Sequence, residues 1–466
     1  AAGQLQRAGL VTTNSIRGGA NRKVLDAICA QTRIFDAWSD EPWVNDGAAV
    51  RVSLVAFGSA EQSALLDDTP VSVIYSDLHA AGEHANDLST AQRLRTNAGV
   101  SFQGPVLVGD FEVAAETARQ WLQTPNPHGR SNADVVRPLT NGKDITARSR
   151  GMWVVDFSAM PQADASLYEM PFEHVQQHVK PMRDSNARKA RRENWWLHGE
   201  TGGGWRGATK NLPRYIATSQ VSKHRAWVWQ SVQVWPHQTV ITIARADDTT
   251  FGILHSRFHE LWSLRMCTWL GVGNDPRYTP TTCFETFPFP AGLTPADTAH
   301  QRTEAVEGGA LIPADLPDTL LAENFKQNQP PAPVHQAQAA INTIAPRPAA
   351  MAIAQAAQRL NTLRQAWLNP PEWTHTVPEV VPLGLSASPY PDRIVPKPGF
   401  EKELAKRTLT NLYNQRPAWL AAAHAQLDAA VAAAYGWADY TADMPDDEIL
   451  RRLLALNLQR CTSEGA

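Results

Sequence analysis

The first 60 residues carry the pattern that most restricts the fold, because strand and helix signals follow one another in a fixed order. An apolar run at 9–13 predicts a buried strand, and residues 21–30 have the periodicity of an amphipathic helix. Apolar residues at 34–38 predict a second strand, residues 39–46 an acidic loop, and the alternating run at 48–57 a third strand. This order is typical of α/β folds, at the closing edge of a doubly wound sheet.

The chain has 466 residues, which at about 150 residues per domain predicts several domains. A tryptophan-rich stretch of mixed α+β character follows the N-terminal part, and a stretch rich in alanine and proline precedes a helical C-terminus. The predicted parts are a sheet edge at 1–58, a connector at 59–126, a mixed α+β domain at 127–291, a partly helical linker at 292–400 and a C-terminal helical domain at 401–466.

Charge is balanced over the whole chain but not locally. The formal net charge is −3, which neither requires nor excludes a polyanionic partner. Residues 180–225, however, hold eleven basic residues against three acidic ones. Many of the 16 tryptophans fall in or near this stretch, where most of them are expected to be core residues. The basic patch indicates a surface for nucleic acid.

Several other classes of protein are disfavoured. The four cysteines lie far apart without a C-x-x-C pair, so we expect reduced thiols and neither disulfides nor a cysteine zinc site. His255 and His259 are spaced like two ligands on one helical face, but no third ligand is evident, and a packed pair is favoured with no metal. No apolar run reaches the roughly 18 residues of a membrane span, so we expect a soluble, cytoplasmic protein.

Six strings of the sequence resemble the MmeI-like branch of type II restriction–modification proteins, which are class I adenine-specific DNA methyltransferases. The resemblance extends over nearly the whole chain. The strings are GLVTTNSIRGGANR at 9–22, FDAWSDEPWVNDGAAVRVSLVAF at 35–57, NGKDITAR at 141–148, YEMPF at 168–172, FGILHSRFHELW at 251–262 and RTLTNLYNQRPAWL at 407–420. The resemblance implies the end of a catalytic methyltransferase domain, a target-recognition domain and a C-terminal helical domain, in that order.

The resemblance also implies S-adenosylmethionine as the cofactor, but this chain lacks the family's catalytic motifs. In the family, Asn-Pro-Pro followed by an aromatic residue orients the adenine amine, and a glycine-rich loop holds the cofactor. Asn369-Pro370-Pro371 is followed by Glu372 and comes after a predicted helix, so we interpret it as a helix stop. We therefore expect no catalytic residue in this chain. Trp43 is the candidate for stacking on a flipped adenine, with Trp38 and a purely structural role as alternatives.

Two sets of residues are candidates for contacting DNA. The first is a polar loop before a strand, where amide, ammonium and guanidinium groups would read bases; it holds Asn141, Lys143, Arg148 and Arg150. The second is a cationic cluster between two strand-like segments, suited to backbone phosphates; it holds Arg214, Lys223, His224 and Arg225. For both sets the alternative is a solvated charged turn.

Two functional hypotheses follow. The first is the C-terminal, target-recognising part of an adenine DNA methyltransferase of a restriction–modification system, acting on duplex DNA after base flipping. The second is a non-catalytic DNA-binding specificity subunit that works with a separate catalytic chain. The absence of an initiating methionine and the strand so near the N-terminus favour a fragment. A structural or RNA-binding role is a further alternative. In either main case we expect the isolated chain neither to bind the cofactor tightly nor to methylate DNA.

Overall fold

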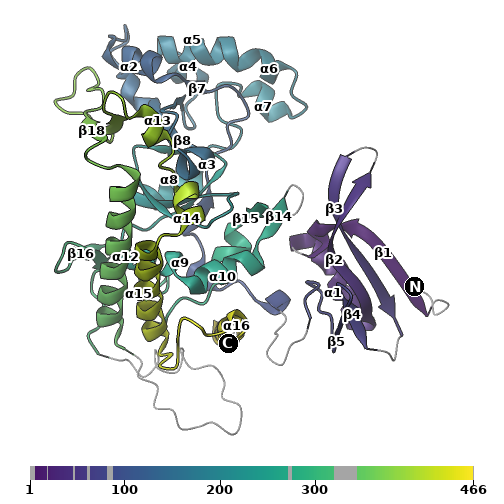
Figure 1. Cartoon of the computed structure of the whole chain (residues 1–466). Helices are drawn as coiled ribbons and strands as arrows, with labels where there is room; N and C mark the ends of the chain where they lie inside the picture. The colour runs from purple at the N-terminus through teal and green to yellow at the C-terminus, as the bar shows by residue number, and fades with distance from the viewer. Residues whose placement is uncertain are drawn as a thin grey trace.

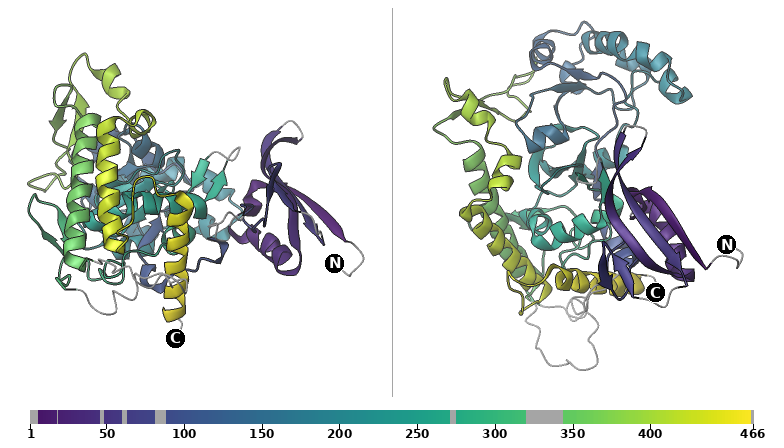
Figure 2. Two further views of the ribbon diagram at one scale, coloured as in Figure 1. Left: turned by 60° about the horizontal axis from the view of Figure 1, so that its bottom comes forward. Right: turned by 45° about the vertical axis from the view of Figure 1, so that its right-hand side comes forward.

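The computed structural model describes residues 6–17, 19–45, 48–59, 63–80, 88–270, 275–319 and 344–464. An N-terminal sheet lies to one side of a larger body, and helices α5, α6 and α7 lie at the end of that body opposite α16 (Figures 1 and 2). The architecture is mixed α/β, with several small sheets and many helices. No helix in these ranges combines the length and apolarity needed to cross a membrane.

The N-terminal sheet has the order β1-β3-β2-β4-β5. Strands β1 and β2 both run antiparallel to β3, so they are parallel to each other with β3 between them. Helix α1 connects them and buries Leu25 against the sheet. The predicted strand-helix-strand-hairpin order is therefore present. The elements are β1 (Arg7–Thr13), α1 (Lys23–Gln31), β2 (Arg33–Asn45), β3 (Ala48–Gly58), β4 (Ala64–Leu66) and β5 (Thr69–Val71).

Two predictions for this sheet are wrong. Strand β1 is an edge strand, and Val11 is 63% exposed rather than buried. The acidic stretch at 39–46 was predicted as a loop, but β2 continues through it to Asn45, with register shifts near Ile34 and Trp38. The bulges let one long strand follow β3 despite its proline and its charged residues. Trp43 consequently lies within a strand, opposite Val50.

The middle of the chain forms two four-stranded sheets, β11-β10-β13-β6 and β12-β8-β9-β7. Their strands are β6 (Ser101–Gln103), β7 (Glu112–Val113), β8 (Val136–Thr140), β9 (Trp153–Val155), β10 (Arg214–Ser219), β11 (Val228–Ser231), β12 (Trp235–Pro236) and β13 (Val240–Ile243). Strands β6 and β7 and helix α2 (Ala115–Gln123) come from the segment predicted as a connector. The mixed domain thus begins earlier than expected, because Phe111 and Leu122 are buried in its core.

Short helices cover these sheets and join them to a second core. They are α3 (Gly142–Thr146), α4 (Gln162–Ala165), α5 (Glu169–His178), α6 (Lys180–Asp184), α7 (Lys189–Glu193), α8 (Gly203–Thr209), α9 (Asp248–His255) and α10 (Arg257–Met266). Hairpin β14 (Thr268–Leu270) and β15 (Asp275–Arg277) and a π-helical turn (Pro280–Phe284) follow α10. Trp153, Trp227 and Trp262 are fully buried, as expected of core tryptophans.

The stretch predicted as a linker contributes a core helix. Helix α12 (Pro346–Leu368) packs against both α9 and α15 (Ala418–Tyr435) and lies beside α15 in Figure 1, and Ile353 and Leu360 are fully buried. The small alanine side chains along α12 allow this close packing. In the sequence, the same alanine-rich composition was interpreted as typical of a linker. Helix α12 ends at Leu368 with Asn369 as its C-cap, so the Asn-Pro-Pro string is the helix stop that was predicted.

The remaining elements are small hairpins and C-terminal helices. They are β16 (Thr303–Ala305), β17 (Leu311–Pro313), β18 (Thr374–Val377), β19 (Arg393–Pro396), α13 (Glu401–Ala405), α14 (Leu409–Gln415) and α16 (Asp446–Glu464). Helices α13 to α16 agree with the helical C-terminus predicted from periodicity.

Candidate nucleic-acid interface

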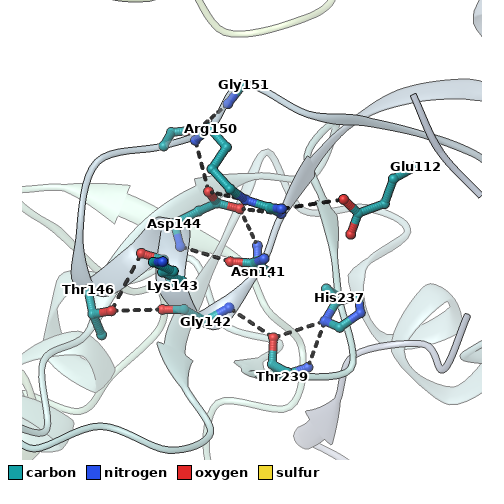
Figure 3. Close-up of polar contacts among 11 residues, drawn as sticks. Glu112, Asn141, Gly142, Lys143, Asp144, Thr146, Arg150, Gly151, His237 and Thr239 are labelled. Carbon is teal, nitrogen blue, oxygen red and sulfur yellow. Dashed lines mark hydrogen bonds and ion pairs between the residues drawn. The ribbon is translucent and has the colours of Figure 1, made fainter. Parts of the chain in front are cut away.

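The first candidate loop is built around helix α3. Asn141 is its N-cap: its side-chain oxygen accepts a hydrogen bond from the Asp144 amide at 2.9 Å, and the Asp144 carboxylate accepts one from the Asn141 amide at 2.9 Å (Figure 3). This reciprocal capping box fixes the start of the helix. The side-chain oxygen of Asn141 is thus occupied by the local fold rather than held out toward a ligand.

Strand β10 and the turn before β13 hold α3 in place. A Cβ atom on Gly142 would lie 2.5 Å from the Ser219 hydroxyl, so only glycine permits this approach. The Gly142 amide donates to the Thr239 hydroxyl at 2.9 Å, and the His237 ring nitrogen Nδ1 lies 2.9 Å from that hydroxyl (Figure 3). No sequence signal associated Thr239 and His237 with this loop, because they lie almost 100 residues after it in the chain and belong to no motif.

Arg150 turns back onto acidic groups. Its backbone amide and its Nε atom donate to the Asp144 carboxylate at 2.9 and 3.2 Å, and its Nη1 atom lies 3.5 Å from the Glu112 carboxylate (Figure 3). The Arg150 side chain is 40% exposed. It is therefore reachable from solvent, but its charge is balanced within the loop.

Lys143 and Arg148 differ sharply in their surroundings. Lys143 is exposed on α3, and no ion pair or side-chain hydrogen bond is recorded for its ammonium group among the described residues. Arg148 instead donates to the Leu368 carbonyl at 3.2 Å and to the Asn369 side chain at 2.9 Å, and burial lowers its pKa. Of the residues predicted in this loop, Lys143 is the one best placed to contact a ligand.

The structure overturns part of the second set. Arg225 is buried: it donates to the carbonyls of Ser219 at 2.6 Å and Pro276 at 3.3 Å, and burial lowers its pKa. Its predicted contact with phosphate is wrong, because the guanidinium anchors the turn from inside. Arg214 is also engaged, pairing with Asp248 at 3.1 Å and stacking 3.6 Å from the centre of the Trp229 ring.

Lys223 and His224 remain at the surface, on the turn between β10 and β11. The Lys223 ammonium and the His224 Nε2 atom both lie 2.8 Å from the side-chain oxygen of Asn414, in α14. Helix α14 also contacts the first loop, because the Thr410 hydroxyl donates to the Thr146 carbonyl at 3.0 Å. One C-terminal helix thus contacts both candidate loops. The sequence does not indicate this, because α14 lies far from both loops in the chain.

The other predicted residues lie elsewhere. Trp43 is 44% exposed on the N-terminal sheet, away from both loops. His255 and His259 are buried. Nδ1 of His255 donates to the Phe251 carbonyl and Nδ1 of His259 to the Leu254 carbonyl, both in α9. Their Nε2 atoms accept from the Trp227 amide and the Tyr278 hydroxyl respectively. Burial lowers the pKa of both rings. They are a packed, hydrogen-bonded pair, and no metal-binding cluster occurs in the described ranges.

Comparison with known proteins matches the chain to a family model and to solved structures. Residues 115–291 match the family model "MmeI, target recognition domain". The whole chain is similar to the solved "Structure of Type IIL restriction-modification enzyme MmeI in complex with DNA has implications for engineering of new specificities", with a TM-score of 0.62 and 15% identity. That match covers 98% of this chain and 50% of the other, so this chain spans about half its length. No curated protein matches the chain. The resemblance drawn from the sequence is thereby confirmed.

Proposed function

Because the chain contains an MmeI-like target recognition domain at residues 115–291, we propose that it recognises a specific sequence of duplex DNA. The family match carries this proposal. Lys143, on the rigid helix α3, is the candidate for a base contact, because an ammonium group can donate to guanine in the major groove. Lys223 and His224 are candidates for the phosphate backbone, which fixes register without reading sequence.

We further propose that this recognition serves an adenine-specific methyltransferase of a restriction–modification system. The solved MmeI structure of similar fold is a restriction–modification enzyme in complex with DNA. The order β1-β3-β2, with an antiparallel strand inserted between two parallel ones, supports a methyltransferase sheet edge. The exposed Val11 on edge strand β1 supports continuation of that sheet by catalytic polypeptide, in the same chain or in a separate one.

The core of the N-terminal sheet does not fit S-adenosylmethionine. Ile16, Leu25 and Ile34 fill the space between α1 and the sheet, and each is at most 7% exposed. No cradle for the cofactor is left in this core. Methyl transfer would therefore need groups outside these residues, and we expect the purified chain to show neither micromolar cofactor binding nor methylation.

Selection from a library of randomised duplexes tests the proposal. The purified chain is expected to enrich one short sequence, with affinity that falls as salt rises. Lys143→Ala is expected to relax the preference at one base pair, by about 1–3 kcal/mol of discrimination. Lys189→Ala, which removes an exposed lysine of α7, is the matched control and should leave the preferred sequence unchanged. Equal binding to every duplex would refute recognition of a target sequence.

A further inference from the structure

We propose that Lys223 and His224 form a binding site for one oxygen of a DNA backbone phosphate, and that the side chain of Asn414 occupies this site in the free protein. This inference rests on the proposed function. In it, Asn414 of α14 competes with a DNA phosphate for the same two donors. The Lys223 ammonium and His224 Nε2 each lie 2.8 Å from the same oxygen of Asn414.

The chemistry of the three groups fixes which atom lies between the donors. An ammonium group can only donate, so the atom of Asn414 that it contacts is the oxygen. The same oxygen can only accept, so His224 carries a proton on Nε2. Two adjacent residues therefore direct N–H groups at a single acceptor, which is the geometry that a phosphate oxygen requires.

The present acceptor supplies no negative charge to these two donors. Asn414 is neutral, and within the described ranges no carboxylate forms an ion pair with Lys223 or His224. Exposed Arg416, two residues beyond Asn414, adds a further cation. Burial raises the pKa of Glu260 in α10, and the nearby charges of Arg416 and His224 act on that pKa in the opposite direction. An anionic oxygen is thus a better partner here than an amide oxygen.

The turn that carries the two donors is fixed before any ligand arrives. The Ser219 hydroxyl donates to the Val221 carbonyl at 2.7 Å, and the Ser222 hydroxyl donates to the His224 carbonyl at 2.9 Å. Buried Arg225 holds the turn from beneath. Exchange of Asn414 for phosphate therefore needs only the rotation of an exposed side chain, so little ordering entropy is lost on binding.

Substitutions in α14 test the exchange. In Asn414→Asp a carboxylate should pair with Lys223 and His224 and lower the affinity for duplex DNA about tenfold. Gln415→Glu adds the same charge one residue away, at an exposed position, and is expected to change affinity less than about twofold. Asn414→Ala removes the competing oxygen and should raise affinity. Lys223→Ala should lower affinity and flatten the salt dependence by about one unit of slope.

The measurements are titrations of the full chain with labelled duplex at several salt concentrations, with thermal melts to show that each variant folds. A wild-type chain that binds DNA with a sequence preference, while Asn414→Asp and Gln415→Glu have equal effects, overturns the phosphate site and leaves the proposed function standing. An unchanged salt slope in Lys223→Ala overturns it as well. A wild-type chain that binds no duplex overturns both.

Discussion

Arg364 in α12 donates a hydrogen bond from Nη2 to the backbone carbonyl of Trp227, at 2.6 Å, although 137 positions separate the two residues in the chain. The same guanidinium donates from Nη1 to Nε2 of His255 in α9. Arg364 is fully buried. A single side chain thus joins the C-terminal helices to the target recognition domain, and it lies in the stretch whose composition predicted a linker.

Removing this link should destabilise the protein. Arg364→Met keeps much of the side-chain volume but leaves the buried Trp227 carbonyl without its partner, so the free energy of unfolding is expected to fall by about 1–3 kcal/mol. Arg359→Met, at an exposed position of the same helix, is the control and should change it by less than about 0.5 kcal/mol. Urea unfolding measures both. Equal losses in the two variants would show that the buried contacts of Arg364 do not stabilise the fold.

The buried histidines should make stability depend on pH. Burial lowers the pKa of His259 to about 3, although the hydrogen bond from its Nδ1 atom to the Leu254 carbonyl acts in the opposite direction. Below about pH 6.5 the unfolded chain binds a proton at this position while the folded chain does not. The contribution of His259 therefore falls from about pH 6.5 toward 3, by up to about 1.4 kcal/mol per unit.

His259→Gln isolates this effect. The variant should be less stable than the wild type at pH 7, because packing and hydrogen bonds are lost, but its stability should fall less steeply between pH 6.5 and 4. Urea unfolding at several pH values gives the two curves. Parallel curves would mean that His259 is not the group that resists protonation in the folded state.

The contact between α9 and α12 depends on a glycine. A Cβ atom at Gly252 would lie 2.6 Å from the Ile353 Cγ2 atom and 3.0 Å from the Ala357 Cβ atom. Gly252→Ala is expected to destabilise by about 1–3 kcal/mol through overpacking, although alanine favours helices. Gly207→Ala in α8, where a Cβ meets nothing within 4 Å, should be neutral or stabilising. Thermal unfolding compares the two; stabilisation by both would show that the helices can separate without loss.

Local signals in the sequence account for the elements that were predicted correctly. The alternating residues of β3 and the periodicity of α1 and α15 act within one element, and they identified strands and helices without knowledge of neighbours. The stop of α12 followed from Asn369-Pro370-Pro371 for the same reason, because proline restricts the residue before it.

The errors concern partners that are distant in the chain. Arg225 looked like part of a surface cluster, but the Pro276 carbonyl that it contacts lies 51 residues away. The sequence did not associate Asn414 with Lys223, because nothing about an asparagine in a helix indicates which distant side chain it will contact. The stretch at 292–400 was interpreted as a partly helical linker because alanine and proline are common in linkers. Its helix was expected, but its place in the core was not: the alanines of α12 permit close packing against α9 and α15.

Asn141 has two candidate roles. The sequence indicated a base contact, whereas the structure shows a helix cap. Asn141→Ala should destabilise by about 1 kcal/mol through loss of the bond to the Asp144 amide. Asn141→Asp keeps an acceptor at the cap and should restore that stability. If the residue only caps α3, the aspartate variant will also keep the wild-type sequence preference in the duplex selection. A changed preference with unchanged stability would instead establish Asn141 as a base-reading residue, because a carboxylate cannot donate to adenine or guanine as an amide does.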